Sequence, residues 1–170
     1  MEPRWSALTG ITALLTLHLL LPPPGRSEDD QSSRIRFTTL SKSTPGGLRT
    51  DLIRDITQDL GGYVWLATDE GLSRFDGFRT VHYSQNPQHP LGLASDQLTC
   101  LATARRSKSK SPLWIGTSSK GLMKLNQDTG EVTRYMSGSA NAAKLLSDHI
   151  TDLDISEEKF LWIGTDAGLN

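Results

Sequence analysis

The stretch that decides the fold is PLWIGTSSKGLMKLN, residues 112–126, because the chain contains this phrase three times. It occurs first as YVWLATDEGLSRFDG at 63–77 and last as FLWIGTDAGLN at 160–170. The tryptophans of the three copies are 49 and 48 residues apart, a period typical of structural repeats. Each copy has an Asp before the Trp and a Gly-Leu pair after it. The repeat positions are Asp51, Trp65, Gly71, Asp96, Trp114, Gly121, Asp148, Trp162 and Gly168.

Each copy has the pattern of four short antiparallel strands. In the second copy the expected strands are QLTCLAT (97–103), LWIGT (113–117), GLMKLN (121–126) and EVTRYM (131–136). The turn before the last of them contains Asp-Thr-Gly, which suits a tight hairpin because Gly accepts a positive φ. In the second strand of every copy the apolar residues are consecutive, which indicates a strand covered on both faces.

These features predict an all-β fold, a partial β-propeller of four-stranded antiparallel blades that follows an N-terminal signal helix. The incomplete propeller covers 35–170, with blades at about 50–84, 96–137 and 148–170. We expect the tryptophan-bearing strands to be among the most buried, and the repeated glycines to supply a bulge or positive-φ turn. A helix pair per repeat is the alternative at this period, but the Gly, Thr and β-branched content disfavours it.

The first 27 residues differ from the rest of the chain. Between Arg4 and Arg26 there is no charged residue, and 5–21 form a mostly apolar run of 17. A basic start, an apolar middle and a small-residue exit predict a signal peptide over 1–27, cut before Glu28. An uncleaved membrane anchor is the alternative, although a full span needs about 20 residues. Either segment would place the remainder outside the cytoplasm.

The short segment ahead of the first copy has the alternation of a strand. Ile35, Phe37 and Thr39 alternate with polar residues. We expect this strand to complete the last blade of a ring, because ring closure removes the exposed sheet edges that invite aggregation.

The composition excludes several classes of function. The net charge is -1, so no global field attracts nucleic acid or an acidic membrane surface. Cys100 is the only cysteine, which allows neither an intrachain disulfide nor a cysteine zinc cluster. The four histidines, His18, His82, His89 and His149, have no metal-ligand spacing. We therefore expect no metal, no cofactor and no nucleic-acid partner.

Three local patterns suggest chemistry, and for each a structural role is favoured. Ser147-Asp148-His149 resembles a set of triad residues, but a triad is assembled from separate segments. The other copies also have Ser/Thr-Asp there, which suits a turn before a strand. The basic stretch 105–110 is read as a solvated loop, with an acidic ligand or lipid as the alternative contact. The stretch 126–130 is read as a hairpin turn, because the twelve-residue calcium-loop pattern is absent.

Cys100 and the repeated tryptophans can likewise be read as functional or as structural residues. Cys100 aligns with Asp55 and Asp152 of the other copies, so we expect an inert packing residue rather than a nucleophile. The tryptophans could stack on a sugar, but their place in doubly covered strands favours packing. No catalytic residue is assigned, and the ligand-binding residues stay unknown. The loops near Asp69-Glu70, Ser118-Lys120 and Asp166-Ala167 are candidates by geometry alone.

The repeat resembles the two-component regulator propeller repeat. The resemblance is carried by DLIRDITQDLGGYVWLATDEGLSRFDGF (51–78) and SDHITDLDISEEKFLWIGTDAGLN (147–170). The link NPQHPLGLASDQL (86–98) and the entry FTTLSKSTPGGLRTDLI (37–53) also resemble that family. The second copy departs from the pattern by its basic insertion, and the first by Leu66-Ala67 in place of Ile-Gly.

The resemblance implies the extracytoplasmic sensor of a bacterial receptor on the periplasmic face of the inner membrane. Such receptors end in a histidine kinase, a hybrid kinase or a diguanylate cyclase. The implied partners are a small-molecule or oligosaccharide ligand, the remaining blades and the downstream receptor domains, in a homodimer when full length. We expect no enzyme activity in this part. The alternatives are a propeller enzyme, such as a lyase or hydrolase, and a secreted interaction scaffold.

The number of copies implies a truncated ring. About seven blades of this length need on the order of 300 residues. Since stacked repeats gain much of their stability from neighbour interfaces, we expect the chain alone to be poorly stable and prone to aggregate.

Overall fold

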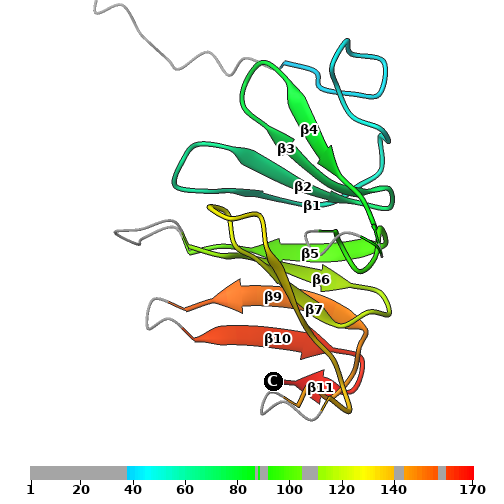
Figure 1. Cartoon of the computed structure of the whole chain (residues 1–170), viewed down its shortest axis with the longest axis vertical. Helices are drawn as coiled ribbons and strands as arrows, with labels where there is room; N and C mark the ends of the chain where they lie inside the picture. The colour runs from blue at the N-terminus through cyan, green and yellow to red at the C-terminus, as the bar shows by residue number, and fades with distance from the viewer. Residues whose placement is uncertain (1–37, 87, 89–91, 105–110, 140–143, 157–159) are drawn as a thin grey trace, which may run out of the picture. The chain divides into compact units, whose positions relative to one another are not determined.

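The computed structural model describes residues 38–86, 88, 92–104, 111–139, 144–156 and 160–170. Within these residues the chain is all-β, and its strands form three antiparallel sheets (Figure 1). This confirms the predicted fold class. The expected signal segment lies outside the described residues. Among those that are described, no helix is long and apolar enough to cross a membrane.

Each sheet is a meander in which neighbours along the chain are neighbours in the sheet, as in a propeller blade. Blade one contains β1 (Ile53–Gln58), β2 (Val64–Thr68), β3 (Gly71–Phe75) and β4 (Thr80–Tyr83). Blade two contains β5 (Leu98–Ala102), β6 (Leu113–Thr117), β7 (Leu122–Leu125) and β8 (Val132–Tyr135). Blade three contains β9 (Ile150–Ile155), β10 (Leu161–Thr165) and the short β11 (Gly168–Leu169).

Two apolar cores hold the three blades together. The core between blades one and two contains Trp65, Ala67, Leu72, Leu93, Leu98, Leu101, Leu113, Ile115, Met123 and Leu125. The core between blades two and three contains Cys100, Ala102, Leu122, Leu145, Ile150 and Leu153, with Trp114 packed against it. Blades one and two therefore each bury one face against the next blade, and the tryptophan of the second strand lies on that face.

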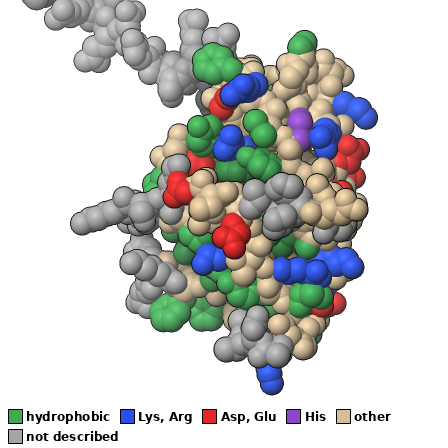
Figure 2. All heavy atoms as spheres, in the orientation of Figure 1, with side chains coloured by type: hydrophobic (Ala, Val, Ile, Leu, Met, Phe, Trp, Pro, Cys, Tyr) green, Lys and Arg blue, Asp and Glu red, His purple; other side chains and the backbone are tan. Residues whose placement is uncertain are grey.

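The burial of the tryptophans falls along this series. Trp65 is 2% exposed, Trp114 is half-buried, and Trp162 is 47% exposed. The expectation of deep burial is thus right for Trp65 and wrong for Trp162. The reason is that no sheet of the described chain packs on the face of β10 that carries Trp162. Figure 2 shows hydrophobic side chains reaching the surface over this part of the molecule.

The opposite face of blade one is uncovered in the same way. Ile56 is 60% exposed, whereas Leu101 and Leu153, at the same place in β5 and β9, are 5% and 8% exposed. Those two leucines are buried because a preceding blade lies against them. The described stack thus exposes apolar side chains at each end, among them Ile56 and Trp162.

The repeated Asp joins each blade to the one before it. The Asp96 carboxylate accepts a hydrogen bond from the backbone N–H of Gln85 (2.5 Å), and its carbonyl accepts one from Gly71 (3.0 Å). Asp148 makes the same two bonds, with Ser137 (2.7 Å) and Gly121 (2.9 Å). The Asp and Gly of the repeat are therefore direct partners across a blade boundary.

The N-terminal part of the described chain begins with an irregular segment. The backbone N–H of Lys42 donates to the Asp51 carboxylate at 2.7 Å, the same bond that Gln85 makes to Asp96. Residues 38–40 form no strand, so the expected strand is not present at Thr39, while Ile35 and Phe37 lie outside the described residues. A strand needs a partner strand for its backbone groups, and no sheet of the described chain offers one there.

The repeated glycines have the predicted positive φ. The values are +101° at Gly71, +73° at Gly121 and +127° at Gly168. At the first two there is also no room for a side chain, since a Cβ would overlap the carbonyl oxygen of Tyr83 or Tyr135. These glycines let the chain turn tightly from the second strand into the third.

Candidate functional site

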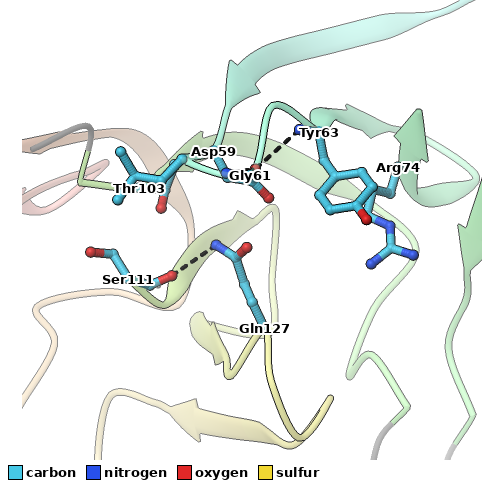
Figure 3. A pocket seen from close by; sticks show the side chains of 8 residues that line it. Asp59, Gly61, Tyr63, Arg74, Thr103, Ser111 and Gln127 are labelled. Atoms are coloured by element: carbon cyan, nitrogen blue, oxygen red, sulfur yellow. Dashed lines mark hydrogen bonds between the residues drawn. The ribbon is translucent and has the colours of Figure 1, made fainter. Parts of the chain in front are cut away.

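A small hollow of about 90 Å³ opens where blades one and two meet. It is lined by the β1–β2 hairpin, by β3, by both ends of the β5–β6 connection and by the β7–β8 turn (Figure 3). The lining residues are Asp59, Leu60, Gly61, Tyr63, Arg74, Thr103, Ser111 and Gln127.

Asp59 fixes the hairpin that forms one wall of the hollow. One carboxylate oxygen accepts the backbone N–H groups of Gly61 (2.8 Å) and Tyr63 (3.1 Å), an Asx-type turn. The other accepts the indole N–H of Trp65 at 2.7 Å. Asp59 is 8% exposed, so this buried carboxylate is compensated by three N–H donors. Both of its oxygens are therefore used in hydrogen bonds that stabilise the hairpin.

Arg74 also lines the hollow, and its guanidinium contacts aromatic rings. Its guanidinium carbon is 4.5 Å from the ring centroid of Tyr63 and 5.6 Å from that of Trp65, within cation–π range. Arg74 is half-buried, and within the described part of the chain it makes no ion pair. Blade two repeats the arrangement, with the Lys124 ammonium 5.5 Å from the ring of Trp114.

The far wall of the hollow is polar. Gln127 donates its side-chain N–H to the carbonyl oxygen of Ser111 at 2.8 Å, which fixes its amide in place. Figure 3 shows Gln127 as the nearest of these side chains to Tyr63 and Arg74, with Thr103 and the hydroxyl group of Ser111 farther away. The site therefore combines one cation and an aromatic ring with hydroxyl and amide groups, a set suited to a small polar solute.

The loops proposed from the sequence lie elsewhere. The turn at Asp69-Glu70 follows β2, whereas the hollow lies at the start of that strand, beside Tyr63. The Asp69 carbonyl accepts a hydrogen bond from the side chain of Gln97 (2.9 Å), so this turn helps to join the first two blades. Sequence reasoning missed the hollow. The sequence feature that pointed to it was a basic residue three positions after the repeated Gly, namely Arg74 and Lys124.

The Ser147-Asp148-His149 pattern forms a turn and not a catalytic set. The Ser147 hydroxyl oxygen accepts the backbone N–H of His149 at 3.0 Å, as Ser95 does from Gln97. His149 Nδ1 lies 3.5 Å from the Asp166 carboxylate in an exposed pair. A hydrogen bond from Ser147, and then the nearby His149, lower the pKa of Asp166. The described contacts therefore do not include the serine–imidazole hydrogen bond that a nucleophile–base pair needs.

A second serine and histidine also form a structural contact. Ser73 Oγ is 2.9 Å from His82 Nδ1, and His82 Nε2 is 3.1 Å from the carbonyl oxygen of Gly47. Because a carbonyl only accepts, Nε2 donates and Nδ1 accepts the serine proton. Ser73 is 4% exposed and lines neither hollow found in the described chain. The pair ties the segment before β1 to blade one.

Asp55 and Asp152, which align in sequence with Cys100, share one type of hydrogen bond. The Asp55 carboxylate accepts the backbone N–H of Ile56 at 2.7 Å, and Asp152 accepts that of Leu153 at 2.9 Å. Asp55 also accepts the backbone N–H of Leu101 in blade two at 2.6 Å. Cys100 is buried at 3% exposure. Among the described residues no three His, Cys, Asp or Glu side chains gather in one place, while residues 105–110, His18 and His89 lie outside them.

We predict that Cys100 reacts with a thiol reagent only when the protein unfolds. Desolvation by burial raises the pKa of its thiol to about 11, so little thiolate exists at neutral pH. The raised pKa also implies that its contribution to stability is complete below about pH 9 and is lost as the pH rises through 11. Labelling with a disulfide reagent at pH 8, with and without urea, measures this. Rapid labelling without urea contradicts the packing role.

Comparison with known proteins shows the fold. No protein family and no curated protein matches the sequence. Among solved structures, the extracellular domain of the hybrid two-component system BT3049 of B. thetaiotaomicron is similar over 71% of this chain, with 24% identity and a TM-score of 0.60. PorZ, a surface component of the type-IX secretion system of Porphyromonas gingivalis, is similar over 69%, with 20% identity and a TM-score of 0.54. The chain spans 18% and 17% of their lengths.

Proposed function

We propose that this chain forms part of an extracytoplasmic, ligand-sensing β-propeller of a bacterial signal-transduction receptor. The observation that carries the proposal is the likeness of its stacked blades to the extracellular domain of the hybrid two-component system BT3049. The export signal predicted for 1–27 and the resemblance to two-component regulator propeller repeats support it.

The receptor we envisage is longer than this chain, since the chain spans less than a fifth of the structures it resembles. Further blades and an output module, either a histidine kinase, a hybrid kinase or a diguanylate cyclase, are its proposed partners. It is a homodimer on the periplasmic face of the inner membrane. Its ligand, a small molecule or an oligosaccharide, signals by binding one receptor state more tightly than another.

The rival functions are a propeller enzyme and a secreted scaffold. A shared fold does not choose among these classes, because unrelated functions occur on one fold. PorZ, for example, is a surface component of a secretion system, and the chain resembles its fold as well. Two experiments separate them.

The first experiment tests export. β-Lactamase fused after Asn170 is expected to confer ampicillin resistance, because that enzyme protects a cell only when it is exported. The matched control lacks residues 1–27 and is expected to leave the cells sensitive, although fusion protein accumulates. Equal sensitivity of both strains at equal protein level contradicts an extracytoplasmic receptor.

The second experiment tests sensing in the natural full-length protein, purified in membranes. Candidate sugars and small acids are added, and both the bound molecule and the activity of the output module are followed. A sensor returns its ligand unchanged and changes its output. Chemical conversion of the bound molecule indicates the enzyme, and binding without any change in output indicates the scaffold.

A further inference from the structure

Arg74 borders the hollow between blades one and two, and its guanidinium has no hydrogen-bond acceptor among the described residues. Arg74 contacts the rings of Tyr63 and Trp65, and within the described chain it has no carboxylate partner. Asp59 also lines the hollow, but both of its oxygens accept N–H groups of its own hairpin. Asp59 therefore does not occupy the guanidinium donors of Arg74.

Ring contacts leave a guanidinium able to bind an anion. A cation–π contact uses the flat face of the group, whereas its five N–H donors point outward in its plane. Two parallel N–H donors match the two oxygens of a carboxylate, which gives a bidentate pair. Half-burial of Arg74 strengthens such a pair, because the effective dielectric is lower than in water.

We propose that this hollow binds the carboxylate end of a small hydroxylated acid. Arg74 takes the carboxylate. Gln127, on the far wall, hydrogen-bonds a hydroxyl group of the same molecule through its side-chain oxygen, because its N–H is already bonded to Ser111. The volume of about 90 Å³ admits one end of such a molecule, so the rest extends past the exposed Leu60 at the rim. The acid could be free or could be the acidic unit of a sugar chain.

A purely structural role for the cation is the competing explanation, and blade two provides its control. Lys124 lies over Trp114 as Arg74 lies over Trp65, yet Lys124 lines neither hollow found in the described chain. If the cation only covers the indole, neutralising Arg74 or Lys124 affects stability to a similar extent and neither change affects ligand binding. If the hollow is a binding site, only Arg74 affects binding.

The probe is sodium glucuronate, with glucose as the neutral match and acetate as the bare carboxylate. Ligand-observed NMR titration of the full chain is expected to give a Kd on the order of 1 mM for glucuronate, since a small site yields only modest affinity. Glucose is expected to bind at least about tenfold more weakly, because it lacks the charge-assisted pair. Weaker binding of acetate than of glucuronate supports the inference, and acetate binding as tightly as glucuronate overturns it, because the hydroxyl groups then contribute nothing.

Arg74→Gln is expected to weaken glucuronate binding at least about tenfold, and Lys124→Gln to leave it unchanged. Arg74→Lys keeps a positive charge over the rings but loses the two parallel N–H donors of the guanidinium. It is expected to weaken binding several-fold with an unchanged urea midpoint, and it decides the matter if Arg74→Gln does not fold. Equal binding of glucose and glucuronate, no loss in the Arg74 variants, or no saturation by 50 mM glucuronate overturns the inference.

The inference rests on the proposed function only in treating the bound acid as a signal. If the export and output experiments succeed and glucuronate does not bind, this site alone is wrong. If glucuronate binds but the output does not respond, or the chain is not exported, the hollow is a binding site on a protein that is not a sensor.

Discussion

Trp65→Ala is expected to lower the free energy of unfolding by about 3–5 kcal/mol, and Trp162→Ala by less than about 1 kcal/mol. The two residues occupy the same repeat position, on β2 and on β10. Trp65 is 2% exposed and lies between two blades, whereas Trp162 is 47% exposed. The indole of Trp65 also donates to the buried carboxylate of Asp59, so its removal leaves an acceptor uncompensated.

The measurement is urea unfolding of the full chain, followed by circular dichroism so that loss of a tryptophan does not alter the probe. Trp65→Phe is the intermediate variant, because it retains much of the apolar contact and removes only the indole N–H. We expect its cost to lie between those of the other two, nearer to about 2 kcal/mol. Equal midpoints for Trp65→Ala and Trp162→Ala contradict the assignment of buried and uncovered blade faces.

The same variants test whether a further blade covers β10 in a longer protein. In a longer protein with a further blade against β10, Trp162 becomes covered as Trp65 is covered by blade two. Trp162→Ala is then expected to cost several kcal/mol, on the order of the Trp65 variant. The difference between the two contexts measures the interface that a further blade forms.

The fold could be read from the sequence because its information is repeated. Consecutive apolar residues in PLWIGT and FLWIGT predicted doubly covered strands, and the spacing of Trp65, Trp114 and Trp162 set the length of one blade. Burial of each individual tryptophan could not be read in this way. It depends on whether another blade lies against that copy, a property of the assembly and not of the repeat.

The repeat contains two further positions that alignment alone did not identify. Leu48, Leu93 and Leu145, three residues before the repeated Asp, are all buried under the blades. Thr68, Thr117 and Thr165 donate their hydroxyl groups to the carbonyl of the repeated Gly at 2.7 Å. Both are visible in the sequence, but their importance follows only from the turns that they close.

The hollow could not be predicted because its walls come from separate blades. Asp59 and Arg74 belong to blade one and Gln127 to a turn of blade two, with no common spacing in the sequence. The relevant repeat signal, the cation after the Gly, exists in both blades. Only the structure shows that Arg74 borders a hollow. The sequence therefore predicted the fold but not the position of the hollow.

Gly121→Ala is expected to cost about 3 kcal/mol in unfolding free energy. Two effects add at this position. An L-residue at φ +73° is strained, and the new Cβ would overlap the carbonyl oxygen of Tyr135, a backbone atom that cannot rotate away. The backbone N–H of Gly121 also donates to Asp148, so a displaced Gly121 weakens the link between blades two and three.

Gly138 provides a matched control, because its φ is also +73° but a Cβ there meets nothing within 4 Å. Gly138→Ala therefore has the strain without the overlap and is expected to cost about 1 kcal/mol. Urea midpoints of the two variants separate steric overlap from backbone strain. Hydrogen exchange adds a second readout. In Gly121→Ala the amide of Ser137, which donates to Asp148, is expected to lose protection, and in Gly138→Ala to keep it. Equal costs for the two variants would show that the turn into β7 relaxes freely, and that the repeated Gly is needed only for its φ.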